Sequence, residues 1–291
     1  MGRIMFDKMF RIIGFVITSI CALLVFMPFL LMISVSLQSD SEIFSPRLVI
    51  IPETFRFDNY LRVFDHGNWL RYFYNSAIVT LISTVVSLLI NSMAGYVFAR
   101  IPFKFNNTLF IIVLVGMMIP VQVTMIPVFT MLRHVPLFGG NDIFGQGGSG
   151  MYDTLTGLIL PFIAGSFGVF LCRQYYLTLP KELDDAAAID GCGRFKTYLK
   201  IYLPLSGPVF ASLGVLKFAG SWNEYTWPLI MTRSDSTRTV QLAISLFRTE
   251  SGIDWSRLMA ASVLISLPIF IVFFATQKRF VAGLTAGSVK G

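Results

Sequence analysis

The stretch LPKELDDAAAIDGCGRFKTYLKIYLPLSGP, Leu179 to Pro208, is strongly charged although the chain around it is apolar. Three acids follow Pro180 closely, at Glu182, Asp184 and Asp185, and acids favour the first turn of a helix because they face the positive end of its macrodipole. A small-residue surface, a turn and a second, basic helical run come next: Ala186, Ala187 and Ala188; Asp190-Gly191; and Arg194, Lys196 and Lys200. The stretch predicts a helix–turn–helix that lies in water across the end of a bundle of apolar helices.

The rest of the chain has the composition of an integral membrane protein. Of 291 residues, 55% are hydrophobic and 13% charged, and the mean hydropathy of +0.70 excludes an ordinary soluble domain. Apolar runs, each near or above the roughly 20 residues that cross a bilayer, predict an all-α, polytopic fold with six transmembrane helices. The predicted spans are 12–37, 72–99, 105–132, 154–176, 205–231 and 258–277.

The lysines indicate how the spans are oriented. In a six-helix arrangement all of them but Lys217 fall on one side: Lys8, Lys104, Lys181, Lys196, Lys200, Lys278 and Lys290. That side is expected to be cytoplasmic, with both termini and the loop 177–204. We therefore expect a cytoplasmic N-terminus, 1–11, and one transmembrane domain, 12–291. The net charge of +7 reports this topology and gives no support to nucleic-acid binding.

Catalytic and metal-binding signatures are missing from the sequence. No P-loop is present, and the two histidines, His66 and His134, are both predicted on the outer side. Cys21, Cys172 and Cys192 do not suggest a disulfide framework. We expect neither a catalytic residue, nor a metal, nor a cofactor in this chain.

Two sequence features lie in and after the predicted span 105–132. Pro120 and Pro127 predict an irregular or broken helix within 105–132. The glycine-rich loop PLFGGNDIFGQGGSGMYD lacks the Gly-Lys-Ser/Thr of a phosphate cradle. It is either a loop that fits a partner or a plain flexible connector.

Lys217 and Glu224 are ionisable residues within the predicted span 205–231, where such groups usually face a cavity or a partner. Pairing of Lys217 with an acid of a neighbouring helix is preferred over a role in the path of an anionic solute. Aromatic residues near Glu224 fit either sugar stacking or an interfacial aromatic belt. The candidate substrate-path residues are Lys217, Trp222, Asn223, Glu224 and Tyr225.

The charged stretch resembles the EAA loop of permease subunits of binding-protein-dependent ABC importers. Asp185-Ala186-Ala187 is followed by Gly191 and by Ile201-x-Leu203-Pro204 at the spacing of that motif, with aspartate in place of the usual glutamate. The segments AGYVFAR, SWNEYTWPLI and GLTAGSVKG are similar to those of the carbohydrate-uptake branch and of its second, maltose-permease-like subunit.

This resemblance implies a type I ABC importer permease fold with a cytoplasmic coupling helix, in a bacterial inner membrane. The implied ATPase-coupling residues are Glu182, Asp184, Asp185, Ala186, Ala187, Asp190 and Gly191. The implied partners are a homologous second permease, two cytoplasmic ATPase subunits that bind ATP and Mg, and an extracytoplasmic solute-binding protein. The implied cargo is a sugar or oligosaccharide. An anionic sugar of the uronate type is a narrower hypothesis that rests on Lys217.

Two rival interpretations stay open at this point. An ion-driven secondary transporter would carry more buried acids than Glu224 and inverted repeats, which we do not find. A membrane-embedded enzyme would need a cluster of His, Asp or Glu at membrane depth, and the sequence shows none.

Overall fold

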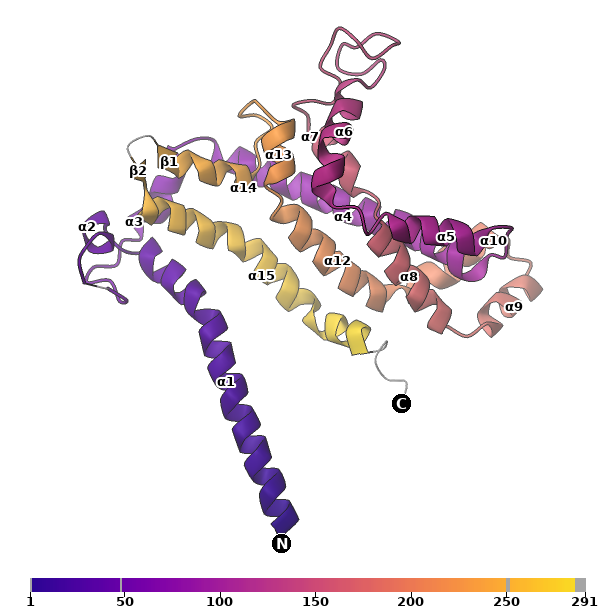
Figure 1. Cartoon of the computed structure of the whole chain (residues 1–291), viewed down its shortest axis with the longest axis horizontal. Coiled ribbons are helices and arrows are strands. Elements are labelled where there is room, and N and C mark those ends of the chain that lie inside the picture. The colour runs from indigo at the N-terminus through magenta and orange to yellow at the C-terminus, as the bar shows by residue number, and fades with distance from the viewer. Residues whose placement is uncertain (1, 48, 250–251, 286–291) are drawn as a thin grey trace. The chain divides into compact units, whose positions relative to one another are not determined.

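A computed structural model of the chain describes residues 2–47, 49–249 and 252–285 (Figure 1). These residues form an almost entirely helical structure, which confirms the predicted all-α class. The chain divides into two compact units, one made of residues 1–67 and 244–267 and the other of 68–243 and 268–291. Helix α15, Trp255–Thr285, contributes to both.

The first unit begins with α1, Gly2–Ser36, in which most large apolar side chains between Ile12 and Ile33 are exposed, as expected for a helix in lipid. The predicted N-terminal segment 1–11 is helical from Gly2 onward. The side-chain amide of Asn59 donates hydrogen bonds to the carbonyls of Ser36 and Gln38, and so holds the end of α1 next to the segment that contains Asn59. The other elements are α2 (Asp40–Ile43), α3 (Asp58–Arg62), η1 (Val63–Asp65), η4 (Ile244–Phe247) and the antiparallel strands β1 (Arg248–Thr249) and β2 (Gly252–Ile253), in which Arg248 pairs with Ile253.

The second unit contains three helices that pack together: α4 (Trp69–Arg100), α8 (Ser166–Thr178) and α12 (Gly207–Trp222). Gly95 allows α4 and α8 to approach closely, because a Cβ there would lie 2.6 Å from Cβ of Cys172. The remaining elements are α5 (Asn106–Val115), α6 (Val121–Arg133), α7 (Leu155–Ile159), η2 (Leu160–Phe162), α9 (Glu182–Ile189), α10 (Arg194–Thr197), the π-helix η3 (Tyr198–Tyr202), α11 (Leu203–Leu205), α13 (Thr226–Met231) and α14 (Val240–Ala243).

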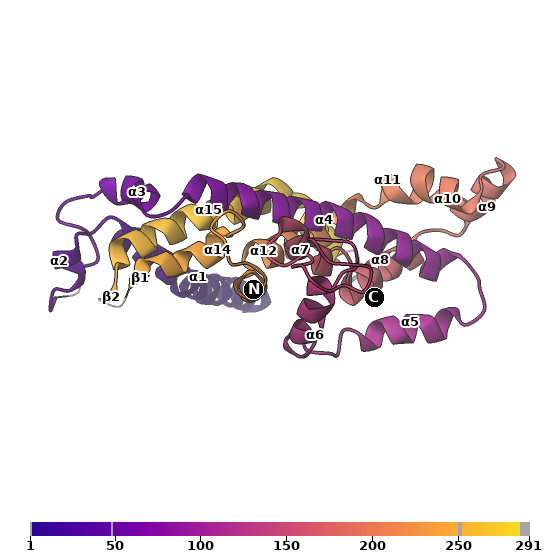
Figure 2. The ribbon, with the colours of Figure 1, turned by 90° about the horizontal axis from the view of Figure 1, so that it is seen from above.

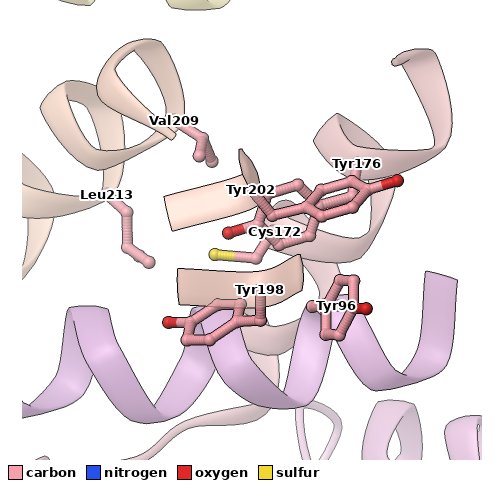
Figure 3. Packing of buried hydrophobic residues seen from close by; sticks show 7 residues of the cluster. All are labelled: Tyr96, Cys172, Tyr176, Tyr198, Tyr202, Val209 and Leu213. Carbon is pink, nitrogen blue, oxygen red and sulfur yellow. The ribbon is translucent and has the colours of Figure 1, made fainter. Parts of the chain in front are cut away.

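Two buried clusters form the core of the second unit. One joins α4, α8, η3 and α12 through Tyr96, Cys172, Tyr176, Tyr198, Tyr202, Val209 and Leu213 (Figure 3). The other joins α4, α6, α7 and α13 through Val79, Leu132, Leu158, Trp227 and Met231. The three cysteines are free thiols, and Cys172 is buried in the first cluster as apolar filling.

Three described helices are long and apolar enough to cross a membrane: Arg11–Ser36, Trp69–Arg100 and Trp255–Gln277. Two bent pairs, 155–162 with 166–178 (44°) and 194–205 with 207–222 (75°), raise the number to five if each pair is one span. The predicted span 105–132 is broken between α5 and α6, with Pro120 at the start of α6, so the expected irregularity is confirmed. The count of six spans stays a prediction.

The predicted span 205–231 contains two helices rather than one. Helix α12 ends at Trp222, and α13 begins at Thr226. In the turn between them, the Glu224 carboxylate accepts a hydrogen bond at 2.9 Å from the amide of Trp227, in the first turn of α13. The end of the sequence, 286–291 with Lys290 and most of the GLTAGSVKG segment, lies outside the described residues, as does Met1.

Candidate functional site

The predicted helix–turn–helix of the charged stretch is confirmed, and both views place α9 and α10 at one end of the second unit (Figure 2). Glu182, Asp184 and Asp185 occupy the first turn of α9. The helix ends in a Schellman motif, in which the amide of Cys192 donates to the carbonyl of Ala187 at 2.8 Å. Gly191 takes the left-handed conformation (φ 66°) that this motif requires.

Helix α9 has two different faces. Residues spaced three and four apart share one face of a helix, and the face made of Glu182, Asp185, Ala186 and Ile189 is exposed. Ile189 is 87% exposed, so this face presents an apolar side chain beside two acids. The expectation that Ala187 belongs to the exposed small-residue surface is wrong. Its side chain is only 2% exposed because it lies on the opposite face of α9.

Asp184 is held by residues of this chain. Its carboxylate lies 3.3 Å from the guanidinium of Arg100, at the end of α4, and accepts a hydrogen bond from the Tyr202 hydroxyl at 2.8 Å. The Arg100 side chain is only 5% exposed and also donates to the carbonyls of Tyr176 and Leu179, at the end of α8. The Arg100–Asp184 ion pair therefore joins the ends of α4 and α8 to the start of α9 and to η3.

Four tyrosines extend this junction into the core (Figure 3). The ring of Tyr202 packs against Tyr96 of α4 at 4.8 Å and Tyr176 of α8 at 5.5 Å between centroids. The hydroxyl of Tyr176 is 2.6 Å from that of Ser206, at the 75° bend before α12, and the hydroxyl of Tyr198 is 2.6 Å from that of Ser92. The segment from Tyr198 to Ser206 is thus held against α4 and α8 by buried contacts.

A second polar region lies inside the same unit. Two cavities, of about 180 and about 280 Å³, share the lining residues Phe162, Lys217 and Glu224. The smaller lies between α4, η2 and α12, and Ser83, Thr84 and Ser221 complete its polar lining. The larger opens toward α6, where Gln122 and Thr124 line it. Both sequence-predicted ionisable residues therefore face cavities.

The preferred prediction for Lys217, pairing with an acid, is not met among the described residues. Its ammonium lies 3.5 Å from the carbonyl oxygen of Phe162, and no carboxylate within the described ranges forms a salt bridge with it. Phe162 is the last residue of η2, and the final carbonyls of a helix have no partner within it. The ammonium therefore approaches a helix end.

The other predicted path residues do not line these cavities. Trp222 is buried and stacks on Phe218, with centroids 5.8 Å apart. Asn223 accepts a hydrogen bond from the Gln241 side chain at 2.8 Å, and Tyr225 is 42% exposed. Asn223 and Tyr225 lie in the turn between α12 and α13, where Glu224 is the residue that lines the cavities.

Sequence reasoning missed the polar face of α4. The buried residues Ser76, Thr80, Ser83, Thr84, Ser87 and Asn91 recur along this helix at steps of three or four. The signal was present in the sequence as a helical repeat of polar residues within an uncharged apolar run.

The glycine-rich loop is held by its own side chains. The Asn141 amide donates to the carbonyls of Arg133 and Val135, and the Asp142 carboxylate accepts from the amides of Phe144 and Gln146. Large apolar side chains are exposed on it, at Leu137, Ile143 and Phe144. These exposed apolar side chains are suited to contact with a partner, which stays a prediction.

Asp153, at the end of this loop, joins it to the segment before α14. Its carboxylate accepts hydrogen bonds from the Thr237 hydroxyl and from the amides of Arg233 and Ser234. Although partial burial opposes ionisation, these hydrogen bonds together hold the pKa of Asp153 below its usual value. In the described part of the chain, no group of three or more His, Cys, Asp or Glu residues could hold a metal ion.

Comparison with known proteins identifies relatives along nearly the whole chain. The family described as binding-protein-dependent transport system inner membrane component matches residues 91–285. The arabinooligosaccharides transport system permease protein AraQ of Bacillus subtilis is 37% identical over 273 residues, 93% of this chain and 92% of its own. The trehalose/maltose transport system permease protein MalG of Thermococcus litoralis is 33% identical, over 98% and 97% of the two chains.

A solved structure shares the fold. A chain of a bacterial ABC transporter involved in the import of the acidic polysaccharide alginate has a TM-score of 0.80 at 22% identity, over 94% of this chain and 97% of that one. The fold and these matches define a multi-pass inner-membrane permease without enzymatic activity of its own. The chain belongs to the family of binding-protein-dependent transport system inner membrane components, as a permease subunit of an ABC transporter.

Proposed function

We propose that this permease imports sugars or oligosaccharides into a bacterial cell, driven by ATP that two partner ATPase subunits bind with Mg and hydrolyse. It crosses the membrane six times with both termini in the cytoplasm and forms half of the pathway, the other half coming from a homologous second permease. An extracytoplasmic solute-binding protein delivers the cargo to the outer mouth, where the exposed apolar side chains of the glycine-rich loop are suited to a protein contact.

The observation that carries this proposal is the two-faced helix α9. Its exposed face, Glu182, Asp185, Ala186 and Ile189, offers two acids and an apolar side chain to a groove of the ATPase. Its inner face is fixed to α4 through Asp184 and Arg100. A movement of the docked ATPase would therefore displace the ends of α4 and α8 together with α9. In this proposal Asp185 meets the ATPase, while Asp190 and Gly191 set the end of the helix.

Names of relatives at 37% and 33% identity refer to arabinooligosaccharides and to trehalose and maltose, which supports a carbohydrate cargo. The polar cavities beside α12 support the same class, because their lining includes hydroxyl and ionisable groups. A uronate-type sugar is a narrower version of the proposal and rests on Lys217, which has no carboxylate partner among the described residues. Loss of uptake of trigalacturonate but not of maltotriose in Lys217→Gln would support it, and equal effects on both would contradict it.

Reconstitution tests the proposal directly. The chain is co-expressed with its second permease and ATPases, and the purified complex is placed in proteoliposomes with the solute-binding protein. Uptake of radiolabelled oligosaccharide should require internal ATP and the binding protein, and should persist when ion gradients are collapsed. Uptake that follows an imposed ion gradient without ATP would instead establish the rival, a secondary transporter. Co-purification of a P-loop ATPase with the tagged chain is the first, simpler step.

A further inference from the structure

Many serine and threonine hydroxyls in the helices of this chain are bonded to their own backbone. They donate to a carbonyl three or four residues earlier, as side chains in an apolar helix do when no other partner is near. Examples on five helices are Ser92 to Leu89, Thr130 to Ile126, Thr178 to Tyr175, Ser212 to Pro208 and Ser262 to Leu258.

Three buried residues of α4, within five positions of one another, have no such bond. Thr80, Ser83 and Thr84 are 0%, 2% and 9% exposed, and their hydroxyl oxygens have no hydrogen-bond partner within the described residues. A buried hydroxyl without a partner destabilises a protein, so three together call for a polar partner from outside the chain. Ser83 and Thr84 line the cavity of about 180 Å³, which provides the space for such a partner.

The opposite wall of this cavity is also polar. Helix α12 contributes the Lys217 ammonium and the Ser221 hydroxyl, and the turn that follows α12 contributes the Glu224 carboxylate. One oxygen of Glu224 is bound to the Trp227 amide, which leaves the other free to accept, while Lys217 can only donate. The ring of Phe162 adds an apolar surface. The cavity therefore combines donors, acceptors and an apolar wall.

This combination selects among chemical classes of ligand. An apolar molecule would leave the hydroxyls unpaired, and a small anion would meet the Glu224 carboxylate as well as Lys217. A sugar ring carries hydroxyls, each both donor and acceptor, around its edge and C–H groups on its faces. We propose that the cavity between α4, η2 and α12 binds one sugar residue of the cargo, with Ser83, Thr84, Lys217 and Glu224 on its hydroxyls and Phe162 against its face.

This site rests on the proposed sugar import and deepens it, because it places a saccharide contact within this subunit. Neutral and uronate sugars share the ring hydroxyls that the site would recognise. The test therefore offers maltotriose, arabinotriose and trigalacturonate to the complete transporter in nanodiscs, where a solute reaches both faces. Ser83→Cys is introduced after Cys21, Cys172 and Cys192 are replaced by alanine, and its modification by a water-soluble thiosulfonate is timed.

We expect at least one of the three saccharides to slow modification at position 83 in a saturable way. Adding Thr84→Val should raise the half-protecting concentration about 2- to 10-fold, which is the effect of losing one hydrogen bond to the ligand. Ser212→Ala is the matched control, because its hydroxyl is bonded to the Pro208 carbonyl and does not line the cavity. It should leave the half-protecting concentration unchanged.

The outcomes separate this site from the function on which it rests. If the cysteine-replaced parent takes up a saccharide that gives no protection at position 83, the site is overturned and the cavity holds only water. Protection that Thr84→Val and Ser212→Ala weaken equally would also overturn it. If the parent takes up no saccharide in the reconstituted uptake assay, the proposed function fails and this assignment fails with it.

Discussion

The guanidinium of Arg100, the last residue of α4, lies 3.3 Å from the carboxylate of Asp184 in the first turn of α9. The two residues are 84 positions apart in the sequence. Side-chain exposures of 5% and 22% make the contact a largely buried ion pair. The helix with an exposed acidic face is therefore attached through its inner face to the longest helix of the second unit, and its position depends on that attachment.

Arg100→Met should destabilise the protein substantially. Removing one partner of a buried ion pair costs about 3–5 kcal/mol, because the remaining charge stays buried and unpaired. Denaturant unfolding of the purified transporter in detergent measures this, with Arg194→Met as the control, since Arg194 is exposed on the same side. A double-mutant cycle with Asp184→Asn should give a coupling energy of about 1–3 kcal/mol. Additive effects of the two changes would contradict the attachment.

Asp185→Asn should behave in the opposite way. Its side chain is exposed and forms no salt bridge with any described residue, so the free energy of unfolding should change by less than about 0.5 kcal/mol. If Asp185 makes the proposed docking contact with the ATPase, uptake and binding-protein-stimulated ATP hydrolysis should nevertheless fall severalfold. Asp184→Asn is the matched comparison and should lower stability. Parent-level stimulation in Asp185→Asn would show that the exposed acid does not meet the ATPase.

Gly191 offers a test of the end of α9 by backbone conformation alone. A Cβ added there would meet no atom within 4 Å, yet its φ of 66° is strained for other residues. Gly191→Ala should therefore cost about 1–2 kcal/mol, and Gly191→Asn less, because asparagine tolerates this conformation. Gly207→Ala is the control, since that position is equally open and lies at the start of a helix. If both alanine variants unfold alike, the Schellman motif does not limit stability.

The parts of this structure that could be predicted from the sequence are the local ones. The acids after Pro180 and the Asp190-Gly191 turn act on their own neighbours, and they gave the bounds of α9 closely. The family motif rests on such local spacing as well. The Arg100–Asp184 pair could not be predicted, because nothing within α9 distinguishes Asp184 from Asp185. Only the packing of α4 against α8 and η3 decides which acid points inward.

The candidate substrate-path residues could be predicted from the sequence only in part. Lys217 and Glu224 stand out in an apolar span, and both do line cavities. Trp222, Asn223 and Tyr225 are close to Glu224 in sequence, but their side chains do not line the cavities: Trp222 stacks on Phe218, and Asn223 bonds to Gln241. Ser83 and Thr84 were overlooked because uncharged hydroxyls are usual in membrane helices. Their unpaired state appears only when their neighbours are known.

Asp153 leads to a prediction for pH dependence. Its folded-state pKa lies below the ordinary 3.8, so the carboxylate stabilises the link between the glycine-rich loop and the segment 233–237. For a lowered pKa this stabilisation is complete above about pH 5 and is lost as the pH falls below 3.8 through the folded-state value. Hydrogen exchange of the amides at 233 and 234, corrected for intrinsic rates, should therefore show less protection at pH 3 than at pH 6.

The Asp153→Asn variant separates this effect from general unfolding in acid. An asparagine tolerates the left-handed backbone at this position (φ 58°) but lacks the charge that strengthens the three hydrogen bonds. Protection of the amides at 233 and 234 should be lower than in the parent at pH 6 and should change little down to pH 3. Asp142→Asn is the control, because that carboxylate bonds only within the glycine-rich loop, at the amides of 144 and 146. If Asp142→Asn removes the pH dependence at 233 and 234 as completely as Asp153→Asn, the loop loosens as a whole and Asp153 is not the group that titrates.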